Sequence, residues 1–241
     1  VDYPDRGGSF VETYYIRDAD MNLAKIPEGV TLEQAVMVPD MMCTAFEGVQ
    51  ALNMKFGQSV AVLGVGPVGL MAVRAAVLQG AGNIFAIGSR PVCFDVARDF
   101  GATHLIDYHN DSYIDQILQE NDGPVDNVVL CGGSERELSL GLRMLKNGGT
   151  LVNLSAYFSN ASIPIQPAVW GFGYGDKTIK GVGCGGGRLL LSRMAQLIAS
   201  GRVAPEKLIT HRYHGMEQIP EAMGLFLRHD RRLIKPVIYN D

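Results

Sequence analysis

The chain has 241 residues, of which 47% are apolar, and its formal net charge is −4 at pH 7. This composition predicts a folded protein of one or two domains, and it lacks the strongly basic balance of proteins that bind nucleic acid or an anionic membrane surface. The first residues are polar and acidic rather than signal-like, so we expect a cytoplasmic protein without a membrane partner.

The first part of the chain gives two local signals. A run with strand character covers Phe10–Ile16, and a helix is predicted to begin near Leu32. Thr31 fits the N-cap of that helix, and Gln34 three residues later completes a capping-box pattern. These elements are too few to bury a core by themselves, so we expect them to belong to a domain completed elsewhere in the chain.

A glycine-rich turn follows the apolar run Ser59–Leu63, which predicts a buried parallel strand. The turn has the pattern G-x-G-x-x-G, in which the first glycine permits a tight bend, the second lets the backbone approach a pyrophosphate, and the third lets the next helix pack closely. A proline at the start of that helix is tolerated because its missing N–H has no partner there. The free N–H groups of this helix would hold the phosphates. We therefore expect the cofactor to contact Gly64, Gly66, Pro67, Val68 and Gly69.

The end of the second predicted strand selects between the two nicotinamide dinucleotides. With 29 glycines in the chain, the turn alone is weak evidence for a dinucleotide site. In an NAD site the second strand ends in Asp or Glu, which accepts a hydrogen bond from the ribose 2′-OH. Here the strand at 83–87 is followed by Gly88, Ser89 and Arg90. A guanidinium and a hydroxyl would bind a 2′-phosphate that a carboxylate would repel, so the sequence predicts NADP with Arg90 as the main discriminator.

Strands and helices then alternate at a steady interval. We expect helices at 91–100, 112–120 and 135–146 and strands at 104–107, 125–130, 150–154 and 178–182. Six strands joined by crossover helices predict an α/β fold with a doubly wound parallel sheet of the Rossmann type. Because ligands bind beyond the carboxyl ends of such strands, Gly88, Tyr108, Cys131 and Gly132 should surround the cofactor.

The last part of the chain reads as a helix at 189–198, a strand at 207–213, a helix at 219–227 and a strand at 233–239. Like the first part, it is incomplete by itself. We therefore predict a nucleotide-binding domain at 44–184 that interrupts a second domain made of residues 1–43 and 185–241.

The cysteines and histidines lack the spacing of a metal cluster. Cys43, Cys93, Cys131 and Cys184 are 38 or more residues apart, so neither a zinc knuckle nor a disulfide framework is indicated. We expect reduced thiols, and we interpret the five histidines as surface or strand-end imidazoles.

Several segments together resemble the zinc-dependent medium-chain alcohol dehydrogenases, and among them the NADP-linked secondary alcohol dehydrogenases of anaerobic microbes. The resemblance covers essentially the whole chain. The segments that carry it are Asp40–Gly48, Gly64–Met71, Gly88–Pro91, Gly101–Thr103 with Tyr108, Trp170–Gly171, Lys177–Gly181 and Gly185–Arg188. The resemblance implies that Ser89, Arg90 and Tyr108 contact the 2′-phosphate, that Thr44 faces the nicotinamide, and that Lys235 approaches the cofactor phosphates.

The resemblance also gives Asp40 a role in catalysis. Similar enzymes hold the catalytic zinc with a Cys, a His and an acidic residue, and Asp40 stands at the position of that acid. Such a zinc stabilises an alkoxide or polarises a carbonyl while hydride passes to or from the nicotinamide. The first half of the catalytic domain of these enzymes has no counterpart in the sequence. We therefore expect this chain to bind NADP without holding zinc and without dehydrogenase activity.

The resemblance implies a small alcohol or ketone as substrate and a homo-oligomer, a dimer or tetramer, for the full-length enzyme. A zinc enzyme of the same superfamily that acts on polyols, amino alcohols or sugars is the first alternative. A non-catalytic NADP-binding module is the second. A zinc-free quinone reductase is disfavoured, because Asp40 would then have no task.

Overall fold

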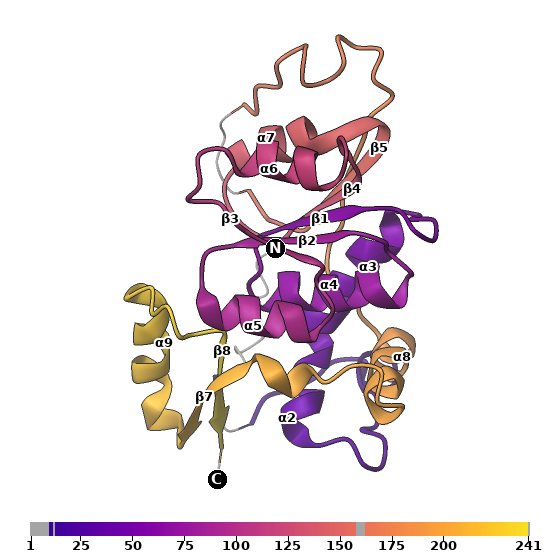
Figure 1. Ribbon diagram of the computed structural model, residues 1–241. Helices are drawn as coiled ribbons and strands as arrows, with labels where there is room; N and C mark the ends of the chain where they lie inside the picture. The colour runs from indigo at the N-terminus through magenta and orange to yellow at the C-terminus, as the bar shows by residue number, and fades with distance from the viewer. Residues whose placement is uncertain (1–9, 12, 158–161, 241) are drawn as a thin grey trace. The chain divides into compact units, whose positions relative to one another are not determined.

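The computed structural model describes residues 10–11, 13–157 and 162–240, and these form two compact units (Figure 1). Unit 1 consists of Val1–Pro39 and Gly186–Asp241, and unit 2 consists of Asp40–Gly185. Unit 2 is thus one continuous stretch of chain, whereas unit 1 is built from two separated stretches. The domain boundaries at 43/44 and 184/185 stay a prediction.

Unit 2 is built on a six-stranded parallel sheet with the strand order β3-β2-β1-β4-β5-β6. Its strands are β1 (Val60–Leu63), β2 (Ile84–Gly88), β3 (His104–Asp107), β4 (Val125–Leu130), β5 (Leu145–Asn153) and β6 (Thr178–Gly181). β1 pairs with β2 on one side and with β4 on the other, so the order of the strands reverses at β1. The predicted doubly wound parallel sheet is confirmed, and its reversal places a crevice beyond the carboxyl ends of β1 and β4.

Helices cover both faces of the sheet in unit 2 (Figure 1). They are α3 (Cys43–Ala51), α4 (Pro67–Leu78), α5 (Pro91–Asp99), α6 (Tyr113–Glu120) and α7 (Arg136–Met144). α3, α4 and α5 lie on one face, and α6 and α7 lie on the other. On the second face Phe85, Ile117, Leu130 and Leu142 are fully buried together, which fixes α6 and α7 on the sheet.

Two features of unit 2 differ from the sequence predictions. The predicted helix at 135–146 ends at Met144, because Leu145 is extended and buried and begins β5 opposite Val125. In addition, α3 was not predicted. It continues directly from a π-helix at Val38–Met42, and its first turn has no side-chain cap, so the sequence carries no start signal for it.

Unit 1 contains short helices and a two-stranded parallel sheet of β7 with β8. Its elements are α1 (Ala19–Asn22), α2 (Leu32–Ala35), α8 (Arg188–Ala199), the 3₁₀ helices η2 (Pro205–Leu208) and η3 (Met216–Gln218), β7 (Ile209–His214), α9 (Ile219–Leu227) and β8 (Lys235–Tyr239). The capping box predicted for α2 is confirmed, since Gln34 N donates to Thr31 Oγ1 at 3.2 Å and Thr31 N donates to Gln34 Oε1 at 3.0 Å. Across all described residues, no helix is long and apolar enough to cross a membrane.

The predicted strand at Phe10–Ile16 is wrong for the residues of that run that are described. They form no strand, and Tyr14 and Tyr15 are exposed. An isolated extended segment gains nothing from its β-propensity until a neighbouring strand accepts its hydrogen bonds. The predicted strands at 207–213 and 233–239 are confirmed but begin later, at Ile209 and Lys235. β7 begins later because Lys207 and Leu208 belong to the 3₁₀ helix that Pro205 starts.

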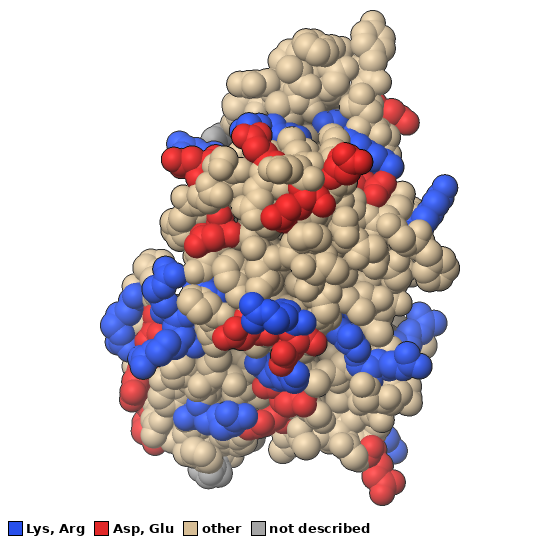
Figure 2. Space-filling view, viewed as in Figure 1, with Lys and Arg blue, Asp and Glu red and all other residues tan. Residues whose placement is uncertain are grey.

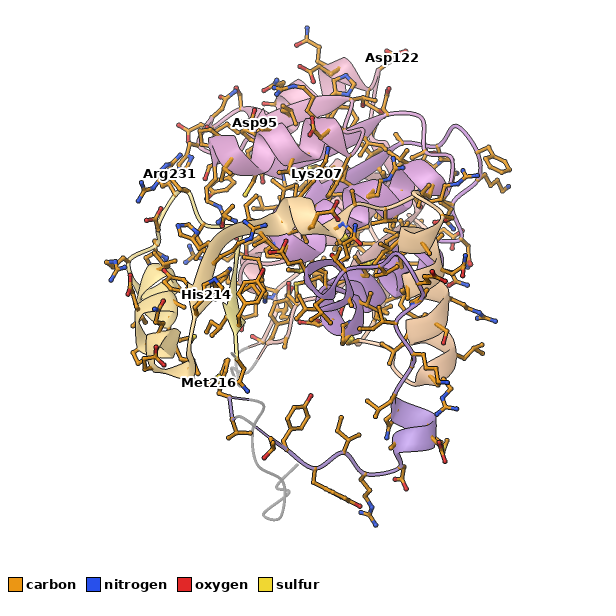
Figure 3. All side chains as sticks on the ribbon, turned by 90° about the horizontal axis from the view of Figure 1, so that it is seen from below. Asp95, Asp122, Lys207, His214, Met216 and Arg231 are labelled. Atoms are coloured by element: carbon orange, nitrogen blue, oxygen red, sulfur yellow. The ribbon has the colours of Figure 1, made fainter. Side chains whose placement is uncertain are left out.

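A three-residue cluster holds α2 to the small sheet within unit 1. Arg212 binds the carboxylate of Glu33 with two N–H groups, at 2.6 and 2.9 Å, and the hydroxyl of Tyr239 also donates to Glu33. The ring of His214, which is labelled in Figure 3, stacks on the ring of Tyr239 with a centroid separation of 4.8 Å. The hydrogen bond from Arg212, followed by that from Tyr239, lowers the pKa of Glu33 to about 2. Glu33 therefore stays ionised in mildly acidic solution, and the cluster links two stretches that lie far apart in the sequence.

In unit 2, a group of hydrogen bonds around Asp126 joins β1 to β4 at their amino-terminal ends. The carboxylate of Asp126 accepts from Ser59 N at 2.8 Å, from Ser59 Oγ at 2.9 Å and from Lys146 Nζ. Partial burial raises the pKa of Asp126, but the hydrogen bonds from Lys146 and Ser59 outweigh it and hold the pKa below its ordinary value of 3.8. The ionised carboxylate thus stabilises the folded state.

Because the folded-state pKa of Asp126 is lowered, its contribution is complete above pH 3.8 and is lost as the pH falls through the folded-state pKa. We expect Asp126→Asn to lower the free energy of unfolding by about 1–2 kcal/mol at neutral pH, with the difference shrinking in acid. Urea denaturation of both proteins across this pH range measures it. Asp95→Asn, which removes an exposed carboxylate paired with Arg98, is the control and should change little. Equal stability of wild type and Asp126→Asn at neutral pH would contradict the prediction.

Candidate nucleotide-binding site

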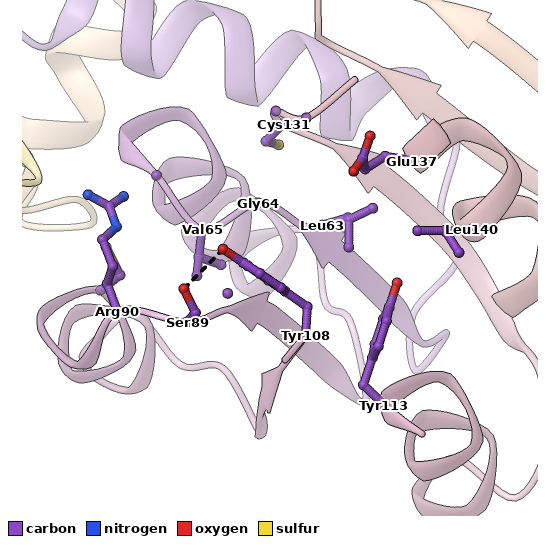
Figure 4. Close-up of a pocket in the computed structure, with 15 residues that line it drawn as sticks. Leu63, Gly64, Val65, Ser89, Arg90, Tyr108, Tyr113, Cys131, Glu137 and Leu140 are labelled. Atoms are coloured by element: carbon purple, nitrogen blue, oxygen red, sulfur yellow. Dashed lines mark hydrogen bonds between the residues drawn. The ribbon is translucent and has the colours of Figure 1, made fainter. Parts of the chain in front are cut away.

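A cavity of about 520 Å³ opens at the carboxyl ends of β1, β2, β3 and β4 in unit 2 (Figure 4). This is the crevice that the reversal of strand order creates. Most of its wall comes from the ends of these strands and the turns that follow them, and the remainder comes from α5, α6 and α7. It is lined by Leu63, Gly64, Val65, Gly66, Gly88, Ser89, Arg90, Cys93, Tyr108, Tyr113, Cys131, Gly132, Gly133, Glu137 and Leu140.

The turn after β1 has the geometry that its three glycines predict. Gly64 has a φ of +96°, which a side chain would strain. A Cβ on Gly69 would lie 2.1 Å from Gly64 O, so only glycine lets α4 start this close to the turn. A Cβ on Gly66 would meet only Arg90 Nη2, at 3.8 Å, which leaves open space in front of the backbone. The residues present therefore form a cradle that a pyrophosphate fits and a side chain would fill.

The first turn of α4 is open to an anion. Pro67 occupies the first helical position and has no N–H, and no side chain caps the helix from Gly66. Val68 and Gly69 complete this turn but do not line the cavity wall itself. An uncapped helix N-terminus carries partial positive charge and unbonded N–H groups, which bind phosphate.

Polar side chains gather where β2 and β3 end. Ser89 Oγ donates to Tyr108 OH at 3.1 Å, and the Arg90 guanidinium reaches the glycine turn, as its approach to Gly66 shows (Figure 4). Gly88 lets this strand end lie against the turn, since a Cβ there would be 2.4 Å from Val65 Cγ2. The carboxylate of Asp107, which is level with Gly88 in the sheet, bonds to His109 and does not line the cavity. The structure thus brings Ser89, Arg90 and Tyr108 together, as the sequence predicts.

The opposite wall carries a carboxylate that the sequence analysis missed. Glu137 Oε2 accepts from Ser134 N at 2.6 Å and from Ser134 Oγ at 2.9 Å, which fixes the turn through Gly132 and Gly133. Burial, with the nearby charge of Glu137, raises the pKa of Tyr113, so this phenol stays protonated. The pattern Ser134-x-x-Glu137 is a capping-box signature, and it was the available signal for Glu137.

The thiols that line the cavity are unreactive. Burial raises the pKa of Cys131 to about 12 and also raises the pKa of Cys93, where the charge of Arg90 only partly opposes it. Both sulfurs are therefore protonated at neutral pH and supply no thiolate nucleophile.

Besides Pro67, Val68 and Gly69 in the first turn of α4, three predicted site residues do not line this cavity, namely Asp40, Thr44 and Lys235. Asp40 is exposed in the π-helix and accepts a hydrogen bond from Thr44 Oγ1 at 3.0 Å, while Thr44 itself is buried in α3. Lys235 begins β8 in unit 1. Among the described residues, no group of three or more His, Cys, Asp or Glu side chains is placed to hold a metal ion. The described residues alone therefore do not fit a zinc centre, and the roles of Asp40, Thr44 and Lys235 stay predictions.

Comparison with known proteins gives the family of the chain. Residues 67–200, more than half of the chain, match the family model described as zinc-binding dehydrogenase. The chain belongs to this family. The match begins at the first residue of α4 and extends through the rest of the sheet of unit 2.

Within the zinc-binding dehydrogenases, the chain is similar to the NADP-dependent isopropanol dehydrogenase of Thermoanaerobacter brockii, with 43% identity over 97% of this chain and 66% of that protein. It is 41% identical to the protein of the same name from Clostridium beijerinckii, over 97% of this chain and 67% of that protein. Among solved structures it resembles the alcohol dehydrogenase TADH from Thermus sp. ATN1, with a TM-score of 0.81 and 31% identity over 92% of this chain and 64% of that one. The chain thus spans about two thirds of the length of these relatives.

Proposed function

We propose that the full-length protein is a zinc-dependent dehydrogenase that transfers hydride between a small secondary alcohol or ketone and NADP. The observation that carries the proposal is the cluster of Ser89, Arg90 and Tyr108 beside the glycine turn, at a strand end without a carboxylate. A 2′-phosphate needs donors and positive charge at this place. The names of the two isopropanol dehydrogenases support the same cofactor and favour a secondary alcohol over a polyol.

Each part of the cavity has a task in this proposal. The uncapped first turn of α4 holds the pyrophosphate, Arg90 and Ser89 hold the 2′-phosphate, and Tyr108 positions the Ser89 hydroxyl. When bound, NADP supplies the hydride acceptor or donor. The chain itself binds and orients the cofactor, and its protonated thiols take no part.

Zinc enters the proposal only for the full-length protein. We propose that Asp40 provides one ligand, with Thr44 Oγ1 orienting the carboxylate through its hydrogen bond. Three protein ligands are needed for a catalytic zinc, and the described residues do not bring three together.

A homo-oligomer in the cytoplasm is also part of the proposal. The segment after β5 carries exposed aromatic side chains, with Phe172 at 73% and Tyr174 at 93% exposure, and it lacks acidic and basic residues from 162 to 175. Figure 2 shows this uncharged end of unit 2 at the top of the view. Exposed aromatic side chains of this kind favour self-association. A sharp monomer in size-exclusion chromatography at high concentration would argue against it.

Titration calorimetry with NADP⁺ and NAD⁺ side by side tests the cofactor. We expect NADP⁺ to bind about a hundredfold more tightly, because the 2′-phosphate gains charge-assisted hydrogen bonds that a 2′-hydroxyl cannot make. Equal affinities would show that Ser89 and Arg90 do not read the 2′-phosphate. Binding of neither nucleotide would show that the cavity does not act alone as the cofactor site.

A further inference from the structure

A second cavity, of about 480 Å³, lies in unit 2 at the opposite edge of the sheet from the nucleotide cavity. It opens at the amino-terminal ends of β1, β4, β5 and β6 and at the end of α3. No step of the proposed reaction uses it. Its lining, unlike that of the first cavity, consists mainly of polar and charged side chains. It is lined by Leu52, Asn53, Lys55, Gln58, Asp126, Asn127, Lys146, Gly148, Thr150, Thr178 and Lys180.

The charges in this cavity do not balance. Lys55, Lys146 and Lys180 face a single carboxylate, that of Asp126, so the formal charge of the lining is positive. Asp126 is already saturated by Ser59 and Lys146. The surplus positive charge therefore rests on Lys55 and Lys180.

The two surplus lysines are held differently. Lys180 Nζ donates to Ala51 O, the last carbonyl of α3, at 2.6 Å, which fixes the ammonium group and leaves it further N–H donors. Lys55 is exposed, and the described residues offer its ammonium group no acceptor. One cation is thus positioned in advance, and the other is available to close on a ligand.

Neutral donors complete the lining. Asn127 is 3% exposed, and its amide nitrogen makes only long hydrogen bonds, at 3.3 Å to Ser59 O and 3.4 Å to Gln58 Oε1. The hydroxyl groups of Thr150 and Thr178 lie on the neighbouring strands β5 and β6. Burying polar groups that are weakly bonded costs free energy, which a ligand with strong acceptors would recover.

We propose that this cavity binds a small polyanion, a molecule that carries two or more phosphate or carboxylate groups. Lys180 and Lys55 bind its charged oxygens, and the amide of Asn127 and the two threonine hydroxyls donate to the remaining acceptors. A single monovalent anion would leave most of the cavity and one of the two ammonium groups unused. The site is separate from the nucleotide cavity, because the two open at opposite ends of the same strands.

Titration calorimetry of the chain with inorganic pyrophosphate, in saturating NADP⁺ and at low ionic strength, tests the proposal. The nucleotide blocks the first cavity, so we expect one pyrophosphate per chain to bind at the second. Lys55→Gln should weaken this binding about tenfold, and Lys55→Gln with Lys180→Gln should abolish it. Citrate, titrated in the same way, distinguishes a general polyanion site from one selective for phosphate.

Lys25→Gln is the matched control, because it removes one exposed positive charge from unit 1. It should leave pyrophosphate binding unchanged, whereas added salt should weaken binding to the wild type. Lys55 is exposed and makes no described side-chain bond, so its variant tests the site even if loss of Lys180 unfolds the end of α3. No pyrophosphate binding by the wild type, or binding that Lys55→Gln leaves intact, would overturn the proposal.

Discussion

Replacing Arg90 with alanine is expected to weaken NADP⁺ binding about a hundredfold and to leave NAD⁺ binding nearly unchanged. The guanidinium provides a rigid fork of donors, and the 2′-phosphate that it would bind is the one group that distinguishes the two nucleotides. Because Arg90 precedes the first turn of α5 and approaches the glycine turn, its loss removes the positive charge at this end of the cavity. Titration calorimetry of the variant with both nucleotides measures the change in selectivity.

Arg90→Lys separates charge from geometry in this experiment. Lysine keeps the positive charge but lacks the fork, so we expect it to recover only part of the selectivity. Tyr108→Phe removes the hydroxyl that bonds to Ser89 and should reduce NADP⁺ affinity by a smaller factor. If Arg90→Ala lowered the affinity for both nucleotides equally, Arg90 would support the fold of the turn rather than read the 2′-phosphate.

The glycine at the third position of the turn is expected to control stability. Gly69→Ala would place a Cβ 2.1 Å from Gly64 O and 2.9 Å from Gly64 C, and both are backbone atoms that cannot move without opening the turn. We expect the free energy of unfolding to fall by about 3 kcal/mol or more. Urea denaturation followed by circular dichroism measures this loss. Alanine is the better helix former, so without the clash the same substitution would stabilise α4 by about 1 kcal/mol.

Gly66→Ala is the matched control for Gly69→Ala, because it adds the same methyl group to the same glycine turn. Its Cβ would meet only Arg90 Nη2, at 3.8 Å, so we expect nearly wild-type stability. The methyl group would occupy the space that the pyrophosphate needs, so nucleotide binding should fall sharply. A stable Gly69→Ala protein, or a Gly66→Ala protein that binds NADP⁺ as the wild type does, would contradict the assigned roles.

The sequence was sufficient for the sheet and for one wall of the cavity. β1 and β2 are short apolar runs, and the turns at Gly64 and Gly88 follow directly from their ends. Ser89 and Arg90 could be placed at the cavity because their distance along the chain from the glycine turn fixes their place in the sheet. These patterns are local in the sequence, so they do not depend on how the helices pack on the sheet.

The other wall depends on tertiary structure. Cys93, Tyr113, Glu137 and Leu140 reach the cavity from three helices, and the face that each helix turns toward the cavity is set by how it packs on the sheet. The end of α7 could not be predicted from the sequence for the same reason. Leu145 and Lys146 suit a helix as well as a strand, and they become extended only through pairing with β4. The run at Phe10–Ile16 has strand-forming side chains but gains no pairing from the described residues.

The two units place different demands on a chain that emerges from the ribosome. Every strand and helix of unit 2 lies within one unbroken stretch, so its sheet can assemble while later residues are still being translated. Unit 1 has to wait, because β7 pairs with β8 and Glu33 receives its hydrogen bond from Tyr239, 206 residues later. Until β8 is synthesised, β7 has no partner strand, and Glu33 in α2 lacks the hydrogen bond from Tyr239. We therefore expect the sheet of unit 2 to form before the sheet of unit 1.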